Sequence, residues 1–121
     1  MDNHLDFTFD PVNYPLAKVQ NLVGDLHAHD QRYVVIVDPG ISNQQPSGTY
    51  SAYDEGTKLG VWITNPDGTP YVGQVWPGVF RKTFHLTWKL TVFPDFFHPA
   101  APGYWQNQIA AFHKVVSCGL L

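Results

Sequence analysis

Four apolar residues follow one another without a polar interruption from Val34 to Val37. Because it is rich in Val and Ile, this run predicts a strand that is buried on both faces, as in a parallel sheet. Asp38 follows at the end of this strand, and Pro39-Gly40 turn the chain away. In an α/β barrel the carboxyl ends of the strands form the active-site floor, so Asp38 is a candidate ligand-binding residue. Capping of the following loop is the structural alternative.

Two other stretches repeat apolar residues at spacings of three and four, which predicts an amphipathic helix on each side of this strand. The first helix begins at Pro15, ends near His29, and has an apolar face made of Leu16, Val19, Val23 and Leu26. The second begins near Ala101 and has an apolar face made of Trp105, Ile109, Phe112 and Val116. A helix, a short link and a buried strand form half of a βαβ unit, so the predicted fold class is α/β.

Between the predicted strand and the second helix the periodicity weakens and turn-forming residues become frequent. Residues 41–59 are rich in Ser, Asn, Gln, Gly and Tyr, which predicts a long loop. Short apolar stretches at 61–63 and 71–75 flank the turn sequence 65–70, and together they predict a β-hairpin. One strand, two helices and about sixty residues of loop fit a complete small domain poorly.

Composition and charge exclude several classes of protein. The 121 residues are 44% hydrophobic with a formal net charge of −3, which argues against disorder and against a nucleic-acid partner. No apolar run approaches the ~20 residues of a membrane span, and no signal peptide opens the chain. The single Cys118 excludes an internal disulfide framework, and its pairing with His113 is no recognisable nucleophile arrangement.

Four other side chains are candidates for chemistry or binding. His27 and His29 could bind a metal, but residues two apart on a helix point in different directions, which favours exposed helix-end histidines. Trp76, held beside Pro77-Gly78, could offer its ring face to a sugar, with ordinary hairpin packing as the alternative. Asp95 lies among aromatic residues, where capping of the turn before the second helix is favoured over ligand binding.

Six motifs in a fixed order make the chain resemble glycoside hydrolase family 31, especially its α-glucosidases. They are Leu5-Asp-Phe-Thr-Phe-Asp10, Asp25-Leu-His27, Val35-Ile-Val-Asp-Pro39, Gly73-Gln-Val-Trp-Pro-Gly78, Val92-Phe-Pro-Asp95 and Pro99-Ala100. The resemblance covers residues 1–78 and 92–116. It implies a segment of a (β/α)₈ barrel and a parent enzyme that hydrolyses terminal α-linked glucose from malto-oligosaccharides with retention of configuration. No cofactor is implied, and the family is usually found in the secretory pathway.

By position in these motifs, the resemblance implies a sugar-binding role for three residues. Trp76 matches an aromatic residue that lines the pocket for the non-reducing glucose, Ile36 matches an aliphatic neighbour, and Asp38 matches an acid close to that pocket. The nucleophile of the family lies in a Trp-(Ile/Leu)-Asp-Met-Asn-Glu strand, which this sequence does not contain, and its acid/base Asp is also missing. Met1 resembles an internal residue of the family. We therefore expect a chain that is poorly folded and inactive on its own.

The resemblance implies only about two residues between the Trp-Pro-Gly turn and the Phe-Pro-Asp segment, so residues 79–91, which occupy this gap, form a predicted insertion. Apolar residues alternate with Thr, His and Lys in this stretch, which is typical of an amphipathic strand. Two explanations remain open, a real extra strand that packs on the hairpin or, preferred, translated intron or misjoined exon sequence. Two rival functions also remain. One is a non-catalytic carbohydrate-binding protein that uses Trp76, and the other is a small metallohydrolase built on His27, His29 and Asp38.

Overall fold

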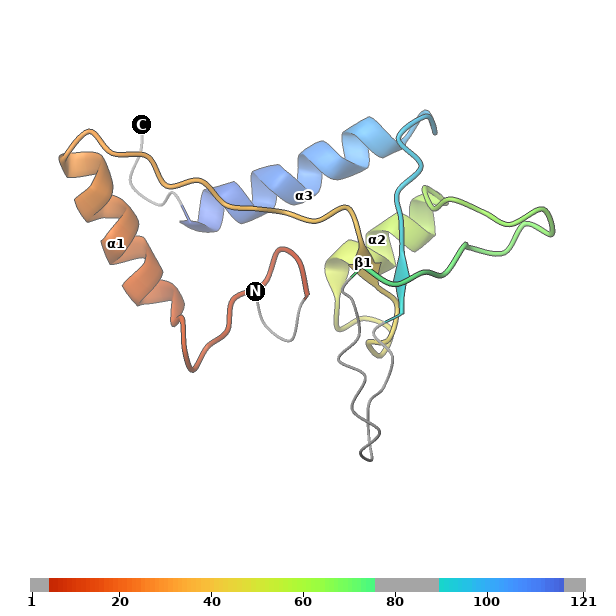
Figure 1. Ribbon diagram of the computed structural model, residues 1–121, viewed down its shortest axis with the longest axis horizontal. Coiled ribbons are helices and arrows are strands. Elements are labelled where there is room, and N and C mark those ends of the chain that lie inside the picture. Colours follow the sequence, from red (N-terminus) through yellow and green to blue (C-terminus); the bar gives the residue numbers. More distant parts are fainter. Residues whose placement is uncertain (1–4, 76–89, 117–121) are drawn as a thin grey trace. The chain divides into compact units, whose positions relative to one another are not determined.

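The computed structural model describes residues 5–75 and 90–116. In chain order its elements are α1 (Leu16–Ala28), β1 (Ile41–Ser42), α2 (Ser51–Leu59), β2 (Thr91–Val92) and α3 (Ala101–Val116), as Figure 1 shows. Two compact units can be distinguished: unit 1 comprises Met1–Asp38 with Trp105–Leu121, and unit 2 comprises Pro39–Tyr104. Each unit has buried side chains of its own.

In unit 1, a small apolar cluster joins α1 to the C-terminal part of α3. Val19 and Val23 of α1 are buried together with Val116, and Phe9 and Phe112 pack against them. Burial of one such aliphatic side chain stabilises a fold by roughly 1.5–3 kcal/mol. The predicted helical periodicities are therefore confirmed, because both amphipathic stretches form helices and turn apolar residues toward a shared cluster.

The segment before α1 is held against α3 by aromatic rings. The Phe9 ring stacks on Phe112 with 5.0 Å between ring centroids, and the Phe7 ring meets Trp105 edge-on at 5.4 Å. Phe7 has a φ of 61°, in the left-handed region that residues other than glycine seldom adopt. Such a conformation costs of the order of 1–3 kcal/mol and persists only where surrounding contacts enforce it. Here the aromatic contacts with α3 enforce it.

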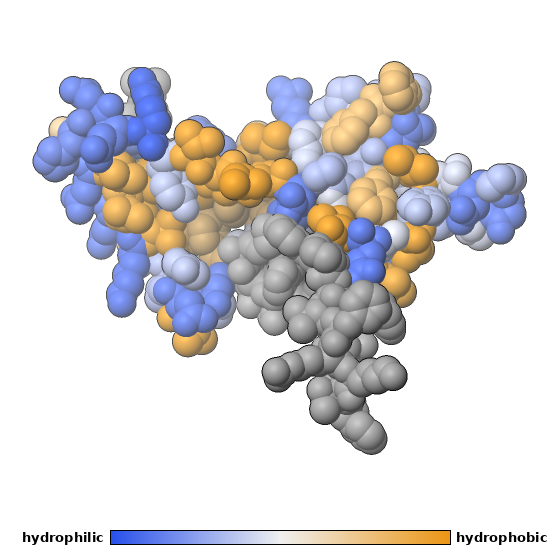
Figure 2. Space-filling view, viewed as in Figure 1, coloured by the Kyte–Doolittle hydropathy of each residue, from blue (hydrophilic) through white to orange (hydrophobic). Residues whose placement is uncertain are grey.

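The predicted buried strand differs from what the structure shows. Residues 31–38 run extended, but they belong to no strand among the described residues. The side chains of Val34 and Ile36 are 83% and 82% exposed, so the prediction of burial on both faces is wrong for this chain. A parallel strand is buried only when neighbouring strands flank it and helices cover the sheet, and no described segment pairs with this one. Figure 2 shows the apolar surface, in orange, that results on the face in view.

Unit 2 is organised around a small antiparallel sheet rather than a parallel one. β1 pairs with β2, with Ile41 opposite Val92 and Ser42 opposite Thr91, and α2 lies against β1 (Figure 1). Ile41 and Val92 are fully buried in its core, as is Val61. The core thus combines residues that lie about fifty positions apart in the sequence.

The predicted loop 41–59 is wrong, because it contains β1 and all of α2. This helix ends where Gly60 adopts a left-handed φ of 65°, and Lys58 lies in its last turn, where a cation interacts favourably with the helix dipole. Gly56 faces inward so that the Trp62 ring can pack directly on the helix backbone. The Tyr53 ring stacks on that indole, with 5.9 Å between ring centroids.

The predicted hairpin is confirmed at its turn and at the inner ends of its arms, but not at their outer ends. The main-chain N–H of Asn65 donates to the carbonyl of Thr69 at 2.8 Å, and Gly68 supplies the positive φ of 83° that the turn requires. Next to the Thr64–Pro70 bridge, the N–H of Tyr71 donates to the carbonyl of Ile63 at 2.7 Å, whereas the outer ends pair with another segment: Trp62 bridges Pro94, and Gly73 bridges Thr91. Residues 90–94 thus lie between the two arms.

Most of the predicted insertion, residues 79–89, lies outside the described residues. Its last residue, Thr91, belongs to β2, and both the main-chain N–H and the hydroxyl of Thr91 donate to the carbonyl of Gly73 at 3.0 Å. Whether 79–91 is an insertion stays a prediction. Among the described residues, no helix is both long and apolar enough to cross a membrane.

Candidate functional site

Two of the three predicted sugar-binding residues lie on the extended segment 31–38, at the end of the N-terminal part of unit 1. Ile36 is largely exposed and Asp38 is half-buried. Side chains of an extended chain alternate between its two faces, so Ile36 and Asp38 share one face and Val35 and Val37 share the other.

The third predicted residue, Trp76, lies outside the described residues, as does Cys118. Val75 is the last described residue before the Trp-Pro-Gly sequence, and it is half-buried. The Val75 side chain contacts the backbone of the buried Gly40, at the site where a Cβ atom would stand. The sugar-binding role of Trp76 stays a prediction.

Directly beside Asp38 lies a buried carboxyl group that the sequence analysis did not single out. Asp6 is only 3% exposed, and its Oδ1 accepts a hydrogen bond from the main-chain N–H of Asp38 at 3.4 Å. Burial raises the pKa of Asp6 from 3.8 to about 6, the hydrogen bond from Asp38 opposes this rise, and the nearby Asp38 carboxylate adds to it. The one signal in the sequence was an acid between apolar residues of the motif 5–10.

Two carboxyl groups in different environments can divide the roles of acid and base in an enzyme. Asp6 is unsuited to that task, because a proton donor must come within hydrogen-bond reach of the leaving group. Its side chain is closed off from solvent and is engaged with the main chain of Asp38. The arrangement therefore acts on the protein backbone rather than on a substrate.

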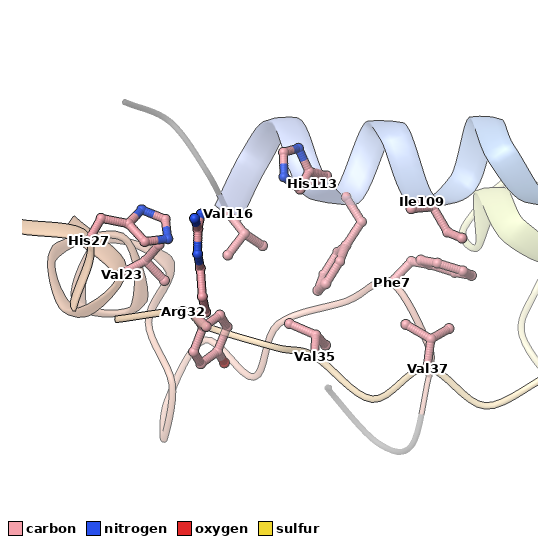
Figure 3. A pocket seen from close by; sticks show the side chains of 11 residues that line it. Phe7, Val23, His27, Arg32, Val35, Val37, Ile109, His113 and Val116 are labelled. Carbon is pink, nitrogen blue, oxygen red and sulfur yellow. The ribbon is translucent and has the colours of Figure 1, made fainter. Parts of the chain in front are cut away.

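The opposite face of the extended segment borders an apolar groove of about 620 Å³ within unit 1. Figure 3 shows Val35 and Val37 on one side of the groove, with Phe7 and Ile109 of α3 across from Val37. His27 and Arg32 lie at the other end of the groove (Figure 3). Most of its lining side chains are apolar and suited to the packing of further apolar side chains, and the polar groups of His27 and Arg32 are confined to one end.

Asp95 has the structural role that the sequence analysis favoured. Its Oδ1 accepts a hydrogen bond from the main-chain N–H of Phe97 at 3.0 Å, and its own N–H donates to the carbonyl of Val61 at 2.7 Å. The carbonyl of Asp95 accepts from the N–H of His98, which completes the turn that leads into α3. The Asp95 side chain therefore serves the turn.

The two histidines at the end of α1 point in different directions. Nδ1 of His29 forms a hydrogen bond with the carbonyl of Asp25 at 2.7 Å, and this histidine is exposed as predicted. His27 is half-buried at the groove, so its predicted exposure was wrong. Within residues 5–75 and 90–116, no three His, Cys, Asp or Glu side chains are grouped so that they could hold a metal ion.

Comparison with known proteins shows the family to which the chain belongs. The family model described as the glycosyl hydrolases family 31 TIM-barrel domain matches residues 1–120. The chain therefore belongs to glycoside hydrolase family 31, and the resemblance seen in its motifs is confirmed.

Among curated proteins, the chain is 43% identical to the lysosomal alpha-glucosidase of Bos taurus over 116 residues, or 96% of this chain. It is 41% identical to the lysosomal alpha-glucosidase of Mus musculus over the same length, and 43% identical to an alpha-glucosidase of Mucor javanicus over 112 residues. The chain spans only 11% of the length of each of these relatives.

Proposed function

We propose that this chain contributes part of the glucose-binding pocket of a retaining α-glucosidase that removes terminal α-linked glucose from malto-oligosaccharides. The observation that carries the proposal is the match to family 31 over nearly the whole chain, together with relatives that are named as alpha-glucosidases. Within the pocket, Trp76 stacks on the sugar, Asp38 accepts hydrogen bonds from its hydroxyl groups, and Ile36 contacts its apolar face.

These three residues bind a sugar but do not cleave its bond. Retaining hydrolysis needs a nucleophilic carboxylate and an acid/base carboxyl group about 5–5.5 Å apart on either side of the glycosidic bond. Stacking and hydrogen bonding position a sugar, but they transfer no proton to the leaving oxygen. Because the family's nucleophile sequence is not among the 121 residues, we propose that a polypeptide of these residues alone is catalytically inactive.

The apolar groove and the exposed extended segment support a place within a larger barrel. Val34 and Ile36 expose apolar side chains on one face, while Val35 and Val37 border the groove on the other. A barrel strand needs a neighbouring strand on each side and helices outside. We propose that further barrel elements pair with residues 33–37 and fill the groove in the α-glucosidase.

For residues 79–91 we propose an insertion relative to the family, derived from translated intron or misjoined exon sequence. The support is that family-like motifs stand on both sides of a stretch that is longer than the resemblance predicts. Sequencing of the mature transcript across this region tests the proposal. A message that lacks the codons for 79–91 agrees with it, whereas a message that retains them favours a real extra strand.

A hybrid enzyme tests the α-glucosidase proposal. The matching segment of the Bos taurus lysosomal alpha-glucosidase is replaced by this chain, and glucose release from maltose is measured for the hybrid and for the 121-residue polypeptide. We expect release by the hybrid and none above a blank by the polypeptide. A folded hybrid that releases no glucose contradicts the assigned activity, and release by the polypeptide contradicts its inactivity.

Two matched variants of the hybrid test the pocket. Trp76→Ala should raise KM for maltose about tenfold, since loss of ring stacking corresponds to ~1.4 kcal/mol. Trp88→Ala is the control, because Trp88 lies in the proposed insertion, and the KM of this variant should stay within about twofold. If the two substitutions change KM for maltose equally, Trp76 does not line the pocket.

A further inference from the structure

The extended segment that carries Asp38 has few ties to the rest of unit 1. Among the described residues, no main-chain N–H from Arg32 to Val37 donates a hydrogen bond, while Gln31 still donates to the carbonyl of Leu26 at 2.8 Å. The N–H of Asp38 is the next to be bonded, and its acceptor is the side chain of Asp6. Asp6 thus ties down the end of a segment whose preceding backbone is free of such restraints in the described structure.

The main chain around Asp6 is itself held in place. Phe7 adopts its left-handed conformation while its ring packs against Trp105 and Phe112 of α3. The hydroxyl of Thr8 donates to the carbonyl of Leu5 at 2.6 Å and closes the same turn. An unusual backbone conformation enforced by tertiary contacts is often found where a side chain must be presented in one direction. At this turn, the side chain presented is Asp6.

We propose that Asp6 is a positioning residue for Asp38: its buried carboxylate holds the main-chain N–H of Asp38 and so sets the direction in which the Asp38 side chain leaves the end of the segment. The inference rests on the proposed function, in which Asp38 binds the sugar. Asp6 touches no substrate, because it is almost completely buried. Its contribution passes through the backbone of Asp38, where a small displacement of a binding carboxylate weakens its hydrogen bonds to a sugar.

Two substitutions at Asp6 separate the acceptor from the charge. Asp6→Asn keeps a side-chain oxygen that can accept from the N–H of Asp38, whereas Asp6→Ala removes it. Asp10→Asn is the matched control, because Asp10 also accepts main-chain hydrogen bonds, from Val12 at 2.8 Å and Asn13 at 2.9 Å, but it is exposed. All three are made in the hybrid enzyme, with KM and kcat for maltose and peptide-resolved hydrogen exchange as readouts.

The proposal expects Asp6→Ala to raise KM for maltose about tenfold, with Asp6→Asn and Asp10→Asn within about twofold of the unsubstituted hybrid. The amide of Asp38 should exchange at least about tenfold faster in Asp6→Ala and remain protected in Asp6→Asn. A merely structural role predicts a different result, in which Asp6→Ala lowers the yield of folded enzyme while KM of the folded fraction is unchanged. That result overturns the proposal.

Failure of the two proposals can be told apart. If the unsubstituted hybrid is folded but releases no glucose, the assigned activity fails, while faster exchange at Asp38 in Asp6→Ala still supports the tie between the two residues. If the hybrid is active and Asp6→Ala changes neither KM nor the exchange of Asp38, the positioning role fails and the activity stands.

Discussion

Replacement of Asp6 by Asn should remove a pH dependence from the stability of unit 1. The pKa of Asp6 is raised from 3.8 to about 6 in the folded chain, mainly by burial, so the folded state binds a proton that the unfolded state has lost between these values. Stability therefore falls as pH rises, since the state that binds more protons is favoured at low pH. The contribution of the Asp6 proton to the free energy of unfolding is fully present below pH 3.8 and is lost as pH rises through about 6.

The size of the effect follows from the shift. A rise from 3.8 to about 6 corresponds to about 3 kcal/mol in full, at 1.36 kcal/mol for each pKa unit. About 2 kcal/mol of it should be lost between pH 4.5 and pH 7, which is roughly a thirtyfold change in the opening equilibrium. Asp10 does not interfere, because hydrogen bonds, chiefly from the N–H of Asn13, lower its pKa, and its contribution is lost only at pH values below this window.

Hydrogen exchange of the 121-residue chain measures the effect with a control in the same molecule. Exchange of the α1 peptide, in unit 1, is compared with exchange of the α2 peptide, in unit 2, at pH 4.5 and pH 7 after correction for intrinsic rates. Protection of α1 relative to α2 should fall about thirtyfold as pH rises. In Asp6→Asn the relative protection should be independent of pH and higher than in the unsubstituted chain at pH 7.

The reasoning is refuted if α1 protection keeps the same pH dependence in Asp6→Asn. The titrating group would then be another one, and the burial of Asp6 would not govern its proton. A chain that shows no protection in α1 at either pH would agree with the expectation that these residues are poorly folded on their own, and it would show that the packing of Val19 and Val23 against Val116 does not hold unit 1 together without the rest of the barrel.

Two further predictions concern unit 2. Gly56→Ala should lower the protection of α2 by roughly 1–2 kcal/mol, because the new methyl group meets the Trp62 ring and this overpacking outweighs the ~1 kcal/mol gain in helix propensity. In the control Gly24→Ala, where nothing lies within 4 Å, the protection of α1 should rise by up to ~1 kcal/mol, and a loss there would refute the steric argument. Tyr104→Phe should lower the free energy of unfolding by about 1–2 kcal/mol, because the buried Tyr104 hydroxyl donates to the carbonyl of Ala52 at 2.7 Å. The measurement is urea unfolding followed by hydrogen exchange of α2, and an unchanged midpoint would show that this bond contributes nothing.

Features that depend on neighbours along the chain can be predicted from the amino-acid sequence. The spacing of apolar residues located α1 and α3, because one helical face is set by residues three and four positions apart. The turn at Asn65–Thr69 was predictable because Gly68 supplies a positive φ that other residues resist. The ordered motifs likewise indicate family 31 without any tertiary information.

Only the tertiary structure decided which segments pair and which side chains are buried. The apolar run at 34–37 predicted burial, but burial needs neighbouring strands that no described residue supplies. The nine residues of α2 have a loop-like composition, so the sequence did not predict this helix. Packing of the Trp62 ring on Gly56 stabilises it. Asp6 and Asp38 lie 32 positions apart, so their hydrogen bond exists only because folding brings two distant segments together. No local pattern records such a contact, since periodicity reports the face of an element and not its partner.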